Sequence, residues 1–440
     1  MPSDDRTRDT IAAIATPAGR GGIGVIRISG PAVARIAAAV LGGLPEPRLA
    51  TFRTFRDHGG DTVDEGLALY FPAPHSYTGE AVLELQGHGG PVVMQALLAA
   101  CLDAGARLAE PGEFTRRAFL EGKLDLAQAE AVADLIDAAS REAARSALRS
   151  LSGEFSAAIG ALQAKLVELR ALTEAMLDFP EEDVDRLHRE DAAGRLAEVR
   201  RALDDVLAKS RQGSLLRSGV HVVLAGRPNV GKSSLLNRLA GEERAIVTAI
   251  PGTTRDALRE PIQIDGVPLV VVDTAGLRES QDELERLGVQ RTQHELQRAD
   301  LVLAVFDASR GRDDLRDLPA AALRIDVYNK LDLAPGFCAP SGALAVSAKT
   351  GEGLELLRRR ILEAAGWSSS GEPVFLARER HLRALEQARG HLAAASGERR
   401  RWEFFAEELR LAHAMLGTIT GEFSADDLLG EIFARFCIGK

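Results

Sequence analysis

Residues 220–233 read VHVVLAGRPNVGKS and decide the fold of the middle of the chain. The apolar, β-branched run VHVVLAG has the pattern of a buried strand, and SSLLNRLA (233–240) has the pattern of a helix. Between them, Gly226 and Gly231 bracket a G-x-x-x-x-G-K-S motif in the strand–loop–helix context of a phosphate-binding loop. Backbone N–H groups of such a loop and the N-terminus of the helix bind phosphate oxygens.

The residues after the glycines supply the chemistry of this loop. Lys232 is expected to reach the β- and γ-phosphates, and the Ser233 hydroxyl is expected to ligate Mg²⁺. The loop and the first helical turn together are expected to contact the nucleotide through Asn229, Val230, Gly231, Lys232, Ser233 and Ser234.

Two later segments have the character of nucleotide switches. In IPGTTRD (250–256), Thr254 can reach Mg²⁺ only when a γ-phosphate is present. In VPLVVVDTAG (267–276), Asp273 would bind Mg²⁺ through water, and the Gly276 N–H can sense the γ-phosphate. The nucleotide-binding residues expected in these segments are Thr248, Ala249, Ile250, Pro251, Gly252, Thr253, Thr254, Asp273, Thr274, Ala275 and Gly276.

Base selection is predicted from VYNKLD (327–332) and the later Ser347-Ala348-Lys349. The Asp332 carboxylate can accept hydrogen bonds from both N1–H and the exocyclic amine of guanine, which adenine cannot donate. Residues 347–349 can place a backbone N–H at the guanine carbonyl. The base-binding set is Asn329, Lys330, Asp332, Ser347, Ala348 and Lys349, and the four motifs together predict a guanine-nucleotide switch domain.

The catalytic group for hydrolysis is left open by these motifs. Leu277 follows Gly276, where Ras-type GTPases place a water-orienting glutamine, and a leucine cannot orient water. Charge stabilisation could come from Arg278 or from a bound cation. The polar groups that could replace the glutamine are Glu279, Asp282, Glu283 and Glu285.

The length and composition of the chain describe a multidomain protein without a broad basic surface. The 440 residues suffice for about three domains, and the net charge of −10 argues against binding nucleic acid by a basic surface alone. No apolar run approaches the ~18 residues of a membrane span, and MPSDDRTRDT lacks a secretory h-region. Three widely spaced cysteines (Cys101, Cys338, Cys437) suit a reducing cytoplasm.

Lysine is rare, with seven lysines against 47 arginines. Lys232, Lys330 and Lys349 lie in the nucleotide motifs, where a compact point charge on a thin stem cannot be replaced by arginine. The other four are either functional or plain surface residues; they are Lys123, Lys165, Lys209 and Lys440.

The N-terminal segment predicts a small α+β domain, residues 1–120. The glycines of TPAGRGGIG (16–24) match a dinucleotide fingerprint, but the VIRIS that follows is a strand pattern, which excludes that interpretation. Alternation places Arg27 on one face of its strand, and in AVLELQ it separates Glu84 from the leucines. Both charged residues are candidates for ligand contacts or for solvated strand faces.

Helical patterns flank the nucleotide motifs. One long helix is expected from the stripe Leu148, Leu151, Phe155, Ile159, Leu162, Leu166 and Leu169. Residues 376–435 are again helical in pattern. The nucleotide domain (218–373) is therefore predicted to be inserted between two halves of one helical domain, residues 121–217 and 374–440.

Over essentially the whole chain, the motifs resemble the MnmE (TrmE) family of tRNA modification GTPases. The resemblance rests on GRPNVGKSSLLN, IPGTTRD, DTAGLRE, NKLD, HSYTGEAVLELQGHGG, KLDLAQAEAV and the terminal CIGK. It implies an N-terminal α+β folate-binding domain that dimerises, a discontinuous all-α helical domain, and an inserted Ras-like P-loop G domain with a mostly parallel sheet.

The resemblance also assigns residues. It implies that K⁺ is bound by Asn229, Thr248, Ile250 and Thr253, so that K⁺ replaces an arginine finger when two G domains pair. Glu285 matches the carboxylate that orients the attacking water. Arg27, Glu84, Lys123 and Lys440 match the residues that contact 5-formyltetrahydrofolate. Cys437 matches the cysteine of the terminal motif, and its chemical role stays open.

By this resemblance the chain would act with the FAD-dependent protein MnmG (GidA) as a heterotetramer. The pair would install a (carboxymethyl)aminomethyl group at C5 of the wobble uridine of certain tRNAs, with a tetrahydrofolate carbon. Two alternatives remain: a ribosome-assembly GTPase, although neither flank shows an RNA-binding GXXG loop or basic stripe, and a non-catalytic nucleotide sensor.

Overall fold

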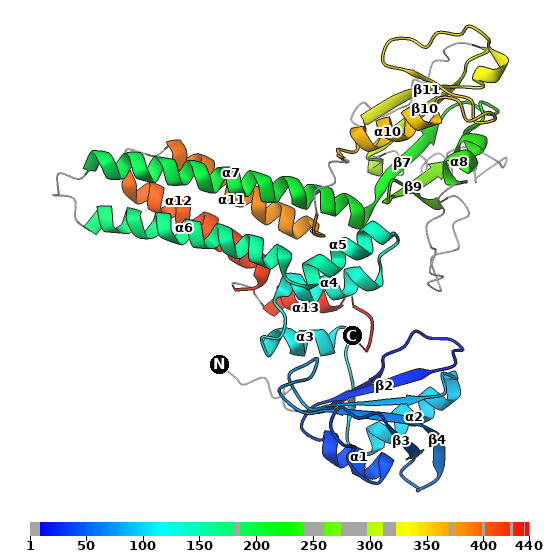
Figure 1. Cartoon of the computed structure of the whole chain (residues 1–440), viewed down its shortest axis with the longest axis vertical. Helices are drawn as coiled ribbons and strands as arrows, with labels where there is room; N and C mark the ends of the chain where they lie inside the picture. The colour runs from blue at the N-terminus through cyan, green and yellow to red at the C-terminus, as the bar shows by residue number, and fades with distance from the viewer. Residues whose placement is uncertain are drawn as a thin grey trace, which may run out of the picture. The chain divides into compact units, whose positions relative to one another are not determined.

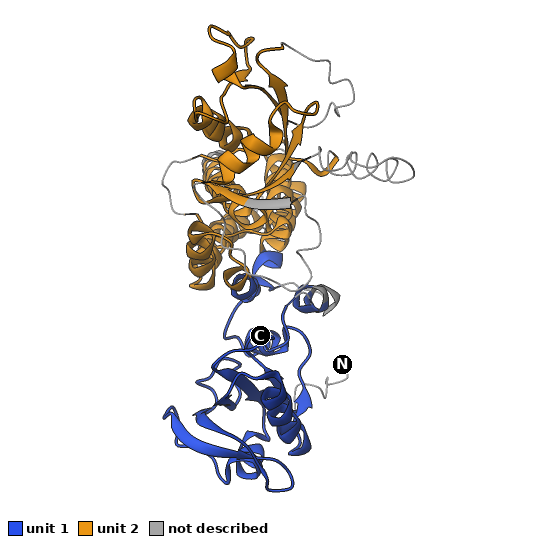
Figure 2. Ribbon diagram, turned by 90° about the vertical axis from the view of Figure 1, so that its right-hand side faces the viewer, with its two compact units in different colours: residues 1–133, 417–440 blue, residues 134–416 orange. Residues whose placement is uncertain are grey.

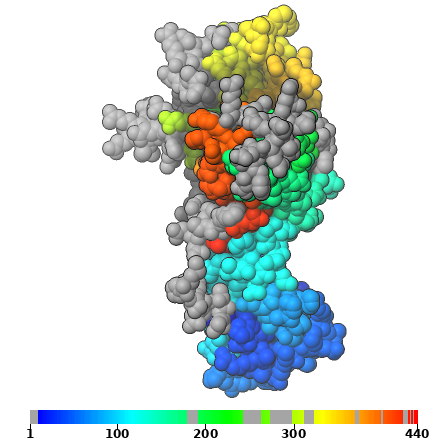
Figure 3. All heavy atoms as spheres, turned by 90° about the vertical axis from the view of Figure 1, so that its left-hand side faces the viewer, coloured from blue at the N-terminus to red at the C-terminus, as the bar shows by residue number. Residues whose placement is uncertain are grey.

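The chain folds into two compact units, residues 1–133 with 417–440 and residues 134–416 (Figure 2). The computed structural model describes residues 9–178, 185–241, 259–273, 297–310, 323–368, 374–397, 401–422, 426–434 and 436–439, drawn in colour in Figure 3. The predicted domain boundaries near residues 120, 217 and 373 divide the chain more finely and stay predictions. Among the described helices, none combines the length and hydropathy needed to cross a bilayer.

The first unit is built on a six-stranded sheet in the order β3-β4-β5-β2-β1-β6, antiparallel except for the β1–β6 pair. One face packs on helices α1 (Val33–Leu41) and α2 (Pro91–Asp103) through Ile26, Ile28 and Leu85. The alternate residues Arg27 and Glu84 lie on the opposite face, as predicted. The strands are β1 Ile11–Ile14, β2 Gly24–Ser29, β3 Thr51–Arg56, β4 Thr62–Phe71, β5 Val82–Gly87 and β6 Arg107–Leu108.

Residues from the C-terminal part of the chain complete this unit. Helix α13 (Asp426–Ala434) packs with α3 (Glu113–Leu120) and α4 (Leu126–Ile136). The shared core consists of Leu126, Ala129, Ile432, Phe433 and Phe436. The sheet and residues 417–439 therefore belong to one folding unit although they are far apart in sequence.

Four long helices run alongside one another in the second unit (Figure 1). They are α6 Glu154–Asp178, α7 Asp185–Ser218, α11 Glu379–Gly397 and α12 Trp402–Thr420. The predicted apolar stripe is buried from Phe155 to Leu169. The prediction of one helix from Leu148 onward is wrong: α5 (Arg141–Leu151) ends first, Gly153 takes a left-handed φ of 91°, and Leu148 is 55% exposed.

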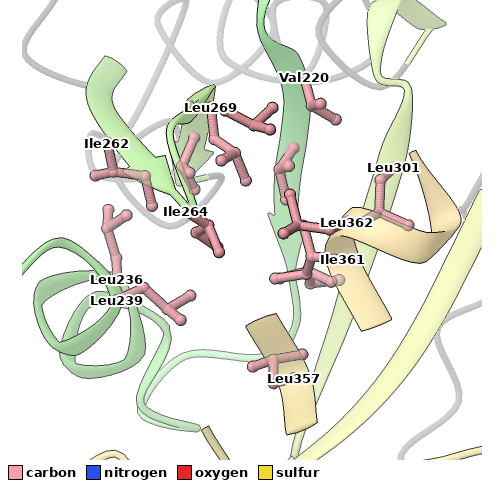
Figure 4. Packing of buried hydrophobic residues seen from close by; sticks show 14 of the residues in the cluster. Val220, Leu236, Leu239, Ile262, Ile264, Leu269, Leu301, Leu357, Ile361 and Leu362 are labelled. Atoms are coloured by element: carbon pink, nitrogen blue, oxygen red, sulfur yellow. The ribbon is translucent and has the colours of Figure 1, made fainter. Parts of the chain in front are cut away.

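The second sheet has the order β12-β11-β10-β7-β9-β8, and only β8 is antiparallel to its neighbour among the described strands. Helices α8 (Lys232–Ala240) and α10 (Leu354–Ala364) cover it, and Figure 4 shows Leu236, Leu239, Leu357 and Ile361 among the residues of its core. This is the predicted P-loop α/β fold. The strands are β7 Val220–Ala225, β8 Arg259–Ile264, β9 Val267–Asp273, β10 Leu301–Asp307, β11 Leu323–Asn329 and β12 Leu344–Ala345.

A network of ion pairs fastens α3 to the first sheet. The carboxylate of Glu113, 1% exposed, accepts hydrogen bonds from Arg107 of β6 at 2.7 Å and from Arg117 at 2.9 Å. Arg117 also pairs with Asp9 at 2.7 Å and with Glu80 at 3.0 Å. Burial raises the pKa of Glu113, but the arginine bonds and the Glu110 N–H outweigh it, so this pKa is lowered.

One buried carboxylate ties together the two chain segments that lead into and out of the second sheet. Asp134, in the last turn of α4, accepts hydrogen bonds from Arg217 at 2.9 Å and from Arg378 at 2.8 and 3.2 Å. Arg217 lies three residues before β7, and Arg378 immediately precedes α11. Asp134 therefore fixes both segments to the same point of the helical part.

We expect Asp134→Asn to lower the free energy of unfolding of the second unit by about 2–3 kcal/mol, because it leaves two guanidinium groups without their anion. Urea unfolding followed by tryptophan fluorescence measures this unit, since both tryptophans (Trp367 and Trp402) lie in it. The control Glu386→Gln removes an exposed pair with Arg211 and should change the value by less than about 0.5 kcal/mol. Equal effects of the two variants would contradict the role of Asp134.

We expect stability of the first unit to depend on acid through Glu113. Its pKa in the folded chain is below its usual value of 4.5, so its stabilisation is complete above pH 4.5 and is lost as pH falls through the folded value. Glu113→Gln should cost about 3 kcal/mol near neutral pH and make unfolding less sensitive to acid.

Scanning calorimetry between pH 3 and 7 measures both effects. Glu110→Gln is the control, because Glu110 is exposed and its pair with Arg116 is 3.6 Å long. An acid dependence that is unchanged in Glu113→Gln would contradict the prediction.

Candidate functional site

The phosphate-binding loop lies between the end of β7 and the start of α8, as the motif predicts. Gly231 caps α8 with a left-handed φ of 92°. A Cβ atom at Gly231 would lie 2.3 Å from the Asn329 Nδ2 atom, and one at Gly226 would lie 2.4 Å from the Val305 carbonyl oxygen. Only glycine fits at either position, because the loop backbone closely approaches the carboxyl-terminal ends of β10 and β11.

Backbone carbonyl groups of the phosphate-binding loop hold the side chain of Lys232. The side chain is 4% exposed, and its Nζ donates hydrogen bonds to the carbonyl oxygens of Gly226 at 2.9 Å and Arg227 at 3.0 Å. Its ammonium group is thus already at the phosphate loop, where a nucleotide phosphate would compete for the same protons. Ser233 and Ser234 follow in the first turn of α8, and both are exposed.

Asn329 joins the phosphate loop to the base-recognition motifs. It is 2% exposed, and its Nδ2 donates to the carbonyl oxygens of Val230 at 3.1 Å and Gly231 at 3.4 Å. Its Oδ1 accepts a hydrogen bond from the Ala348 N–H at 3.0 Å. The structure therefore brings three predicted motifs together around one side chain.

The acidic residue predicted to select guanine is also fixed. The buried Ser347 donates from Oγ to Asp332 Oδ1 at 2.7 Å, and the Thr350 N–H donates to Ser347 Oγ at 3.1 Å. The Leu331 N–H donates to the Val346 carbonyl at 3.1 Å and aligns the two segments. Lys349 is exposed beside them.

Asp307 is a site residue that the sequence motifs did not indicate. It ends β10, is 4% exposed on its side chain, and accepts a hydrogen bond from Lys330 Nζ at 2.8 Å. Burial raises its pKa, but the hydrogen bonds from Lys330 and Ser309 outweigh burial and lower it. The available signal was its position at the carboxyl end of a fully apolar strand beside β7, where polar residues face a site.

Several predicted residues lie outside the described part of the chain. Asp273 is the last residue of β9, and its strand position alone is described. The residues outside the described ranges are Thr248, Ala249, Ile250, Pro251, Gly252, Thr253, Thr254, Thr274, Ala275, Gly276, Arg278, Glu279, Asp282, Glu283, Glu285 and Lys440.

A second candidate site lies on the face of the first sheet that is opposite to α1 and α2. Arg27 and Glu84 are cross-strand neighbours on β2 and β5, and the Arg27 guanidinium pairs with Glu84 Oε1 at 2.8 and 2.9 Å. The guanidinium also lies 5.4 Å from the Tyr77 ring centroid and 5.9 Å from that of Phe114. Both charged side chains are mostly but not fully buried, so a ligand can reach a pre-formed pair.

Lys123 and the C-terminal tail reach the same sheet region. A Cβ atom at Gly79 would lie 3.4 Å from Lys123 Cε, so the lysine stem packs on the loop that carries Tyr77. A Cβ atom at Gly439 would lie 2.5 Å from the Ile14 carbonyl oxygen at the end of β1. β1 is the neighbour of β2, which places the tail one strand from Arg27.

Two cysteines differ sharply in their surroundings. Cys437 is exposed, and its carbonyl accepts the Gly112 N–H at 3.4 Å. Burial raises the pKa of the Cys101 thiol to about 12, so this thiol stays protonated at neutral pH. Of these two thiols, Cys437 is the one that solvent and ligands can reach.

Comparison with known proteins covers nearly the whole chain. The family model described as "GTP-binding protein TrmE N-terminus" matches residues 10–123, and the model "MnmE helical domain" matches residues 126–437. The G domain of the T. maritima FeoB iron transporter matches with 28% identity, over 33% of this chain and 98% of that one. Its TM-score is 0.25, and it contributes nothing to the assignment.

Full-length relatives are closely similar. The tRNA modification GTPase MnmE of Azoarcus sp. (strain BH72) is 61% identical over 446 aligned positions, which cover 99% of each chain. The protein of the same name from Dechloromonas aromatica (strain RCB) is 60% identical and covers 98% of this chain and 99% of its own.

Proposed function

This chain belongs to the MnmE family of tRNA modification GTPases, and from that premise we propose that it couples K⁺-dependent GTP hydrolysis to modification of C5 of the wobble uridine. The product would be a (carboxymethyl)aminomethyluridine whose carbon comes from a tetrahydrofolate. The observation that supports the GTP part most strongly is the contact of Asn329 with the phosphate loop and with Ala348.

The GTP site divides into a phosphate half and a base half. Lys232 would bind the β- and γ-phosphates from the buried position it holds on the loop. Ser233 and Thr254 would hold Mg²⁺, which supplies charge compensation on the phosphates when bound. Asp332, held by Ser347, would accept the guanine N–H groups.

Hydrolysis would rely on K⁺ and on Glu285. The proposed K⁺ ligands, Asn229, Thr248, Ile250 and Thr253, offer amide and carbonyl oxygens, which suit a hard cation. Asn229 is the described member of the set, and it has a left-handed φ of 64°. When bound, K⁺ would supply the positive charge that an arginine finger gives elsewhere, while Glu285 would orient the water.

The folate site would use the pair on the first sheet. A reduced pterin offers adjacent N–H groups that can donate hydrogen bonds to a carboxylate such as Glu84, and the bond from Arg27 holds that carboxylate in its orientation. Lys123 and Lys440 would bind the anionic end of the cofactor as point charges. Cys437 would lie near this chemistry through the packing of the tail on β1.

The partners follow from the same proposal. The chain would form a homodimer and join the FAD-dependent MnmG in a heterotetramer that acts on tRNA in the cytoplasm. The net charge of −10 supports a division of labour in which the partner supplies most of the tRNA-binding surface.

We expect GTP turnover to be at least about tenfold faster in KCl than in NaCl, because K⁺ replaces the missing cationic group. Glu285→Ala should lower kcat in KCl by about 10²-fold or more with unchanged affinity for GDP. Phosphate release measures both, and Glu363→Ala, an exposed carboxylate of α10, should behave as wild type. Equal turnover in the two salts would contradict the role of K⁺.

We expect 5-formyltetrahydrofolate to bind the wild-type chain in isothermal titration and Arg27→Ala to weaken it by about tenfold or more, because the charge-assisted pair is lost. The matched control is Arg53→Ala, an exposed arginine of β3 in the same sheet. Absence of binding heat, or an equal loss in Arg53→Ala, would refute the folate site.

A further inference from the structure

Asp307 uses both oxygens of its carboxylate. Oδ1 accepts the Ser309 N–H at 3.0 Å and the Ser309 hydroxyl at 2.6 Å, while Oδ2 accepts Lys330 Nζ at 2.8 Å. The carboxylate lies at the end of β10, the strand between β7 and β11. The two bonds from Ser309 therefore fix the orientation of the carboxylate independently of Lys330.

Lys330 joins Asp307 to the phosphate loop. Its Nζ also donates to the Asn229 carbonyl oxygen at 2.5 Å. A Cβ atom at Gly231 would lie 3.9 Å from Lys330 Cε, so the lysine stem passes close to the loop glycine. The ammonium group thus bridges an anchored anion and the peptide that precedes Val230.

Lys330 and Asn229 both adopt conformations that are unfavourable without the contacts of this bridge. An anchored lysine side chain loses rotamer entropy, which an unanchored ammonium would recover by moving away. Asn229 has φ 64° and Lys330 has φ 66°, and residues other than glycine uncommonly adopt this left-handed conformation. Removing the carboxylate would release the lysine first and the Asn229 peptide with it.

We propose that Asp307 is a positioning residue of the nucleotide site: through the Lys330 ammonium it holds the Asn229 peptide, and thereby sets the direction of the loop N–H groups that meet the phosphates. This inference rests on the proposed GTP site. Asp307 need not touch the nucleotide, and it acts on GDP and GTP alike because both use the same loop.

A double-mutant cycle on the full chain tests the proposal. Asp307→Asn keeps the shape and removes the charge, and Lys330→Met keeps most of the stem and removes the ammonium. We expect Asp307→Asn to raise the Kd of fluorescent GDP five- to tenfold. The KM for GTP should rise by a similar factor, while kcat stays within twofold of the wild-type value. In the Lys330→Met background the same substitution should change Kd by less than twofold, because its route to the loop is gone.

The control is Asp300→Asn. Asp300 directly precedes β10, and Asp307 is the last residue of that strand. Asp300 is exposed and accepts the His221 N–H at 2.8 Å, so its substitution should leave Kd within twofold. Ser309→Ala provides a milder variant if Asp307→Asn folds poorly. It removes the hydroxyl bond to Oδ1 and keeps the bond from the residue 309 N–H, so it should loosen the carboxylate and raise Kd two- to threefold, again only when Lys330 is present.

Additive effects of Asp307→Asn and Lys330→Met would overturn the proposal, because they would show that Asp307 stabilises the domain without acting through the lysine. An unchanged Kd in both Asp307→Asn and Ser309→Ala would overturn it as well. Failure of the wild-type chain to bind GDP would instead refute the GTP site, and the inference with it.

Discussion

The side-chain amide of Asn329 is the interaction on which the nucleotide domain depends, because it satisfies backbone groups from two loops at once. It donates to the phosphate loop and accepts from the segment that follows β12. A buried amide left without these partners would cost about 1–3 kcal/mol for each lost bond. Since parallel strands end at one edge of the sheet, β7, β11 and β12 deliver these loops to the same place.

Local patterns predicted the parts of this structure that local chemistry decides. The β-branched run before Gly226 forms β7, and alternation on β2 and β5 places Arg27 and Glu84 on one face. Short motifs carried these predictions because glycine geometry and strand periodicity act within a few residues. The close approach of Gly231 to Asn329 follows from the P-loop α/β fold, because the loop after β7 and the end of β11 lie at the same edge of the sheet.

Contacts between distant segments were beyond such patterns. Asp307 was missed because its position at the end of an apolar strand does not reveal its partner. Its role arises from Lys330, which is brought beside it by the β10–β11 pairing. Asp134 was missed for the same reason, since its two arginines come from elsewhere in the sequence. The break between α5 and α6 was missed because the apolar spacing continues across Gly153 although the helix does not.

The packing of α13 against α3 and α4 also constrains how the protein can be made. During synthesis the ribosome delivers residues 1–133 first, yet the apolar side chains that cover Leu126 and Ala129 emerge only after the whole of residues 134–416. Until then the nascent first unit exposes the apolar side chains of Leu126 and Ala129 to solvent. The core that α3 and α4 share with α13 can therefore be completed only after the ribosome has synthesised the second unit.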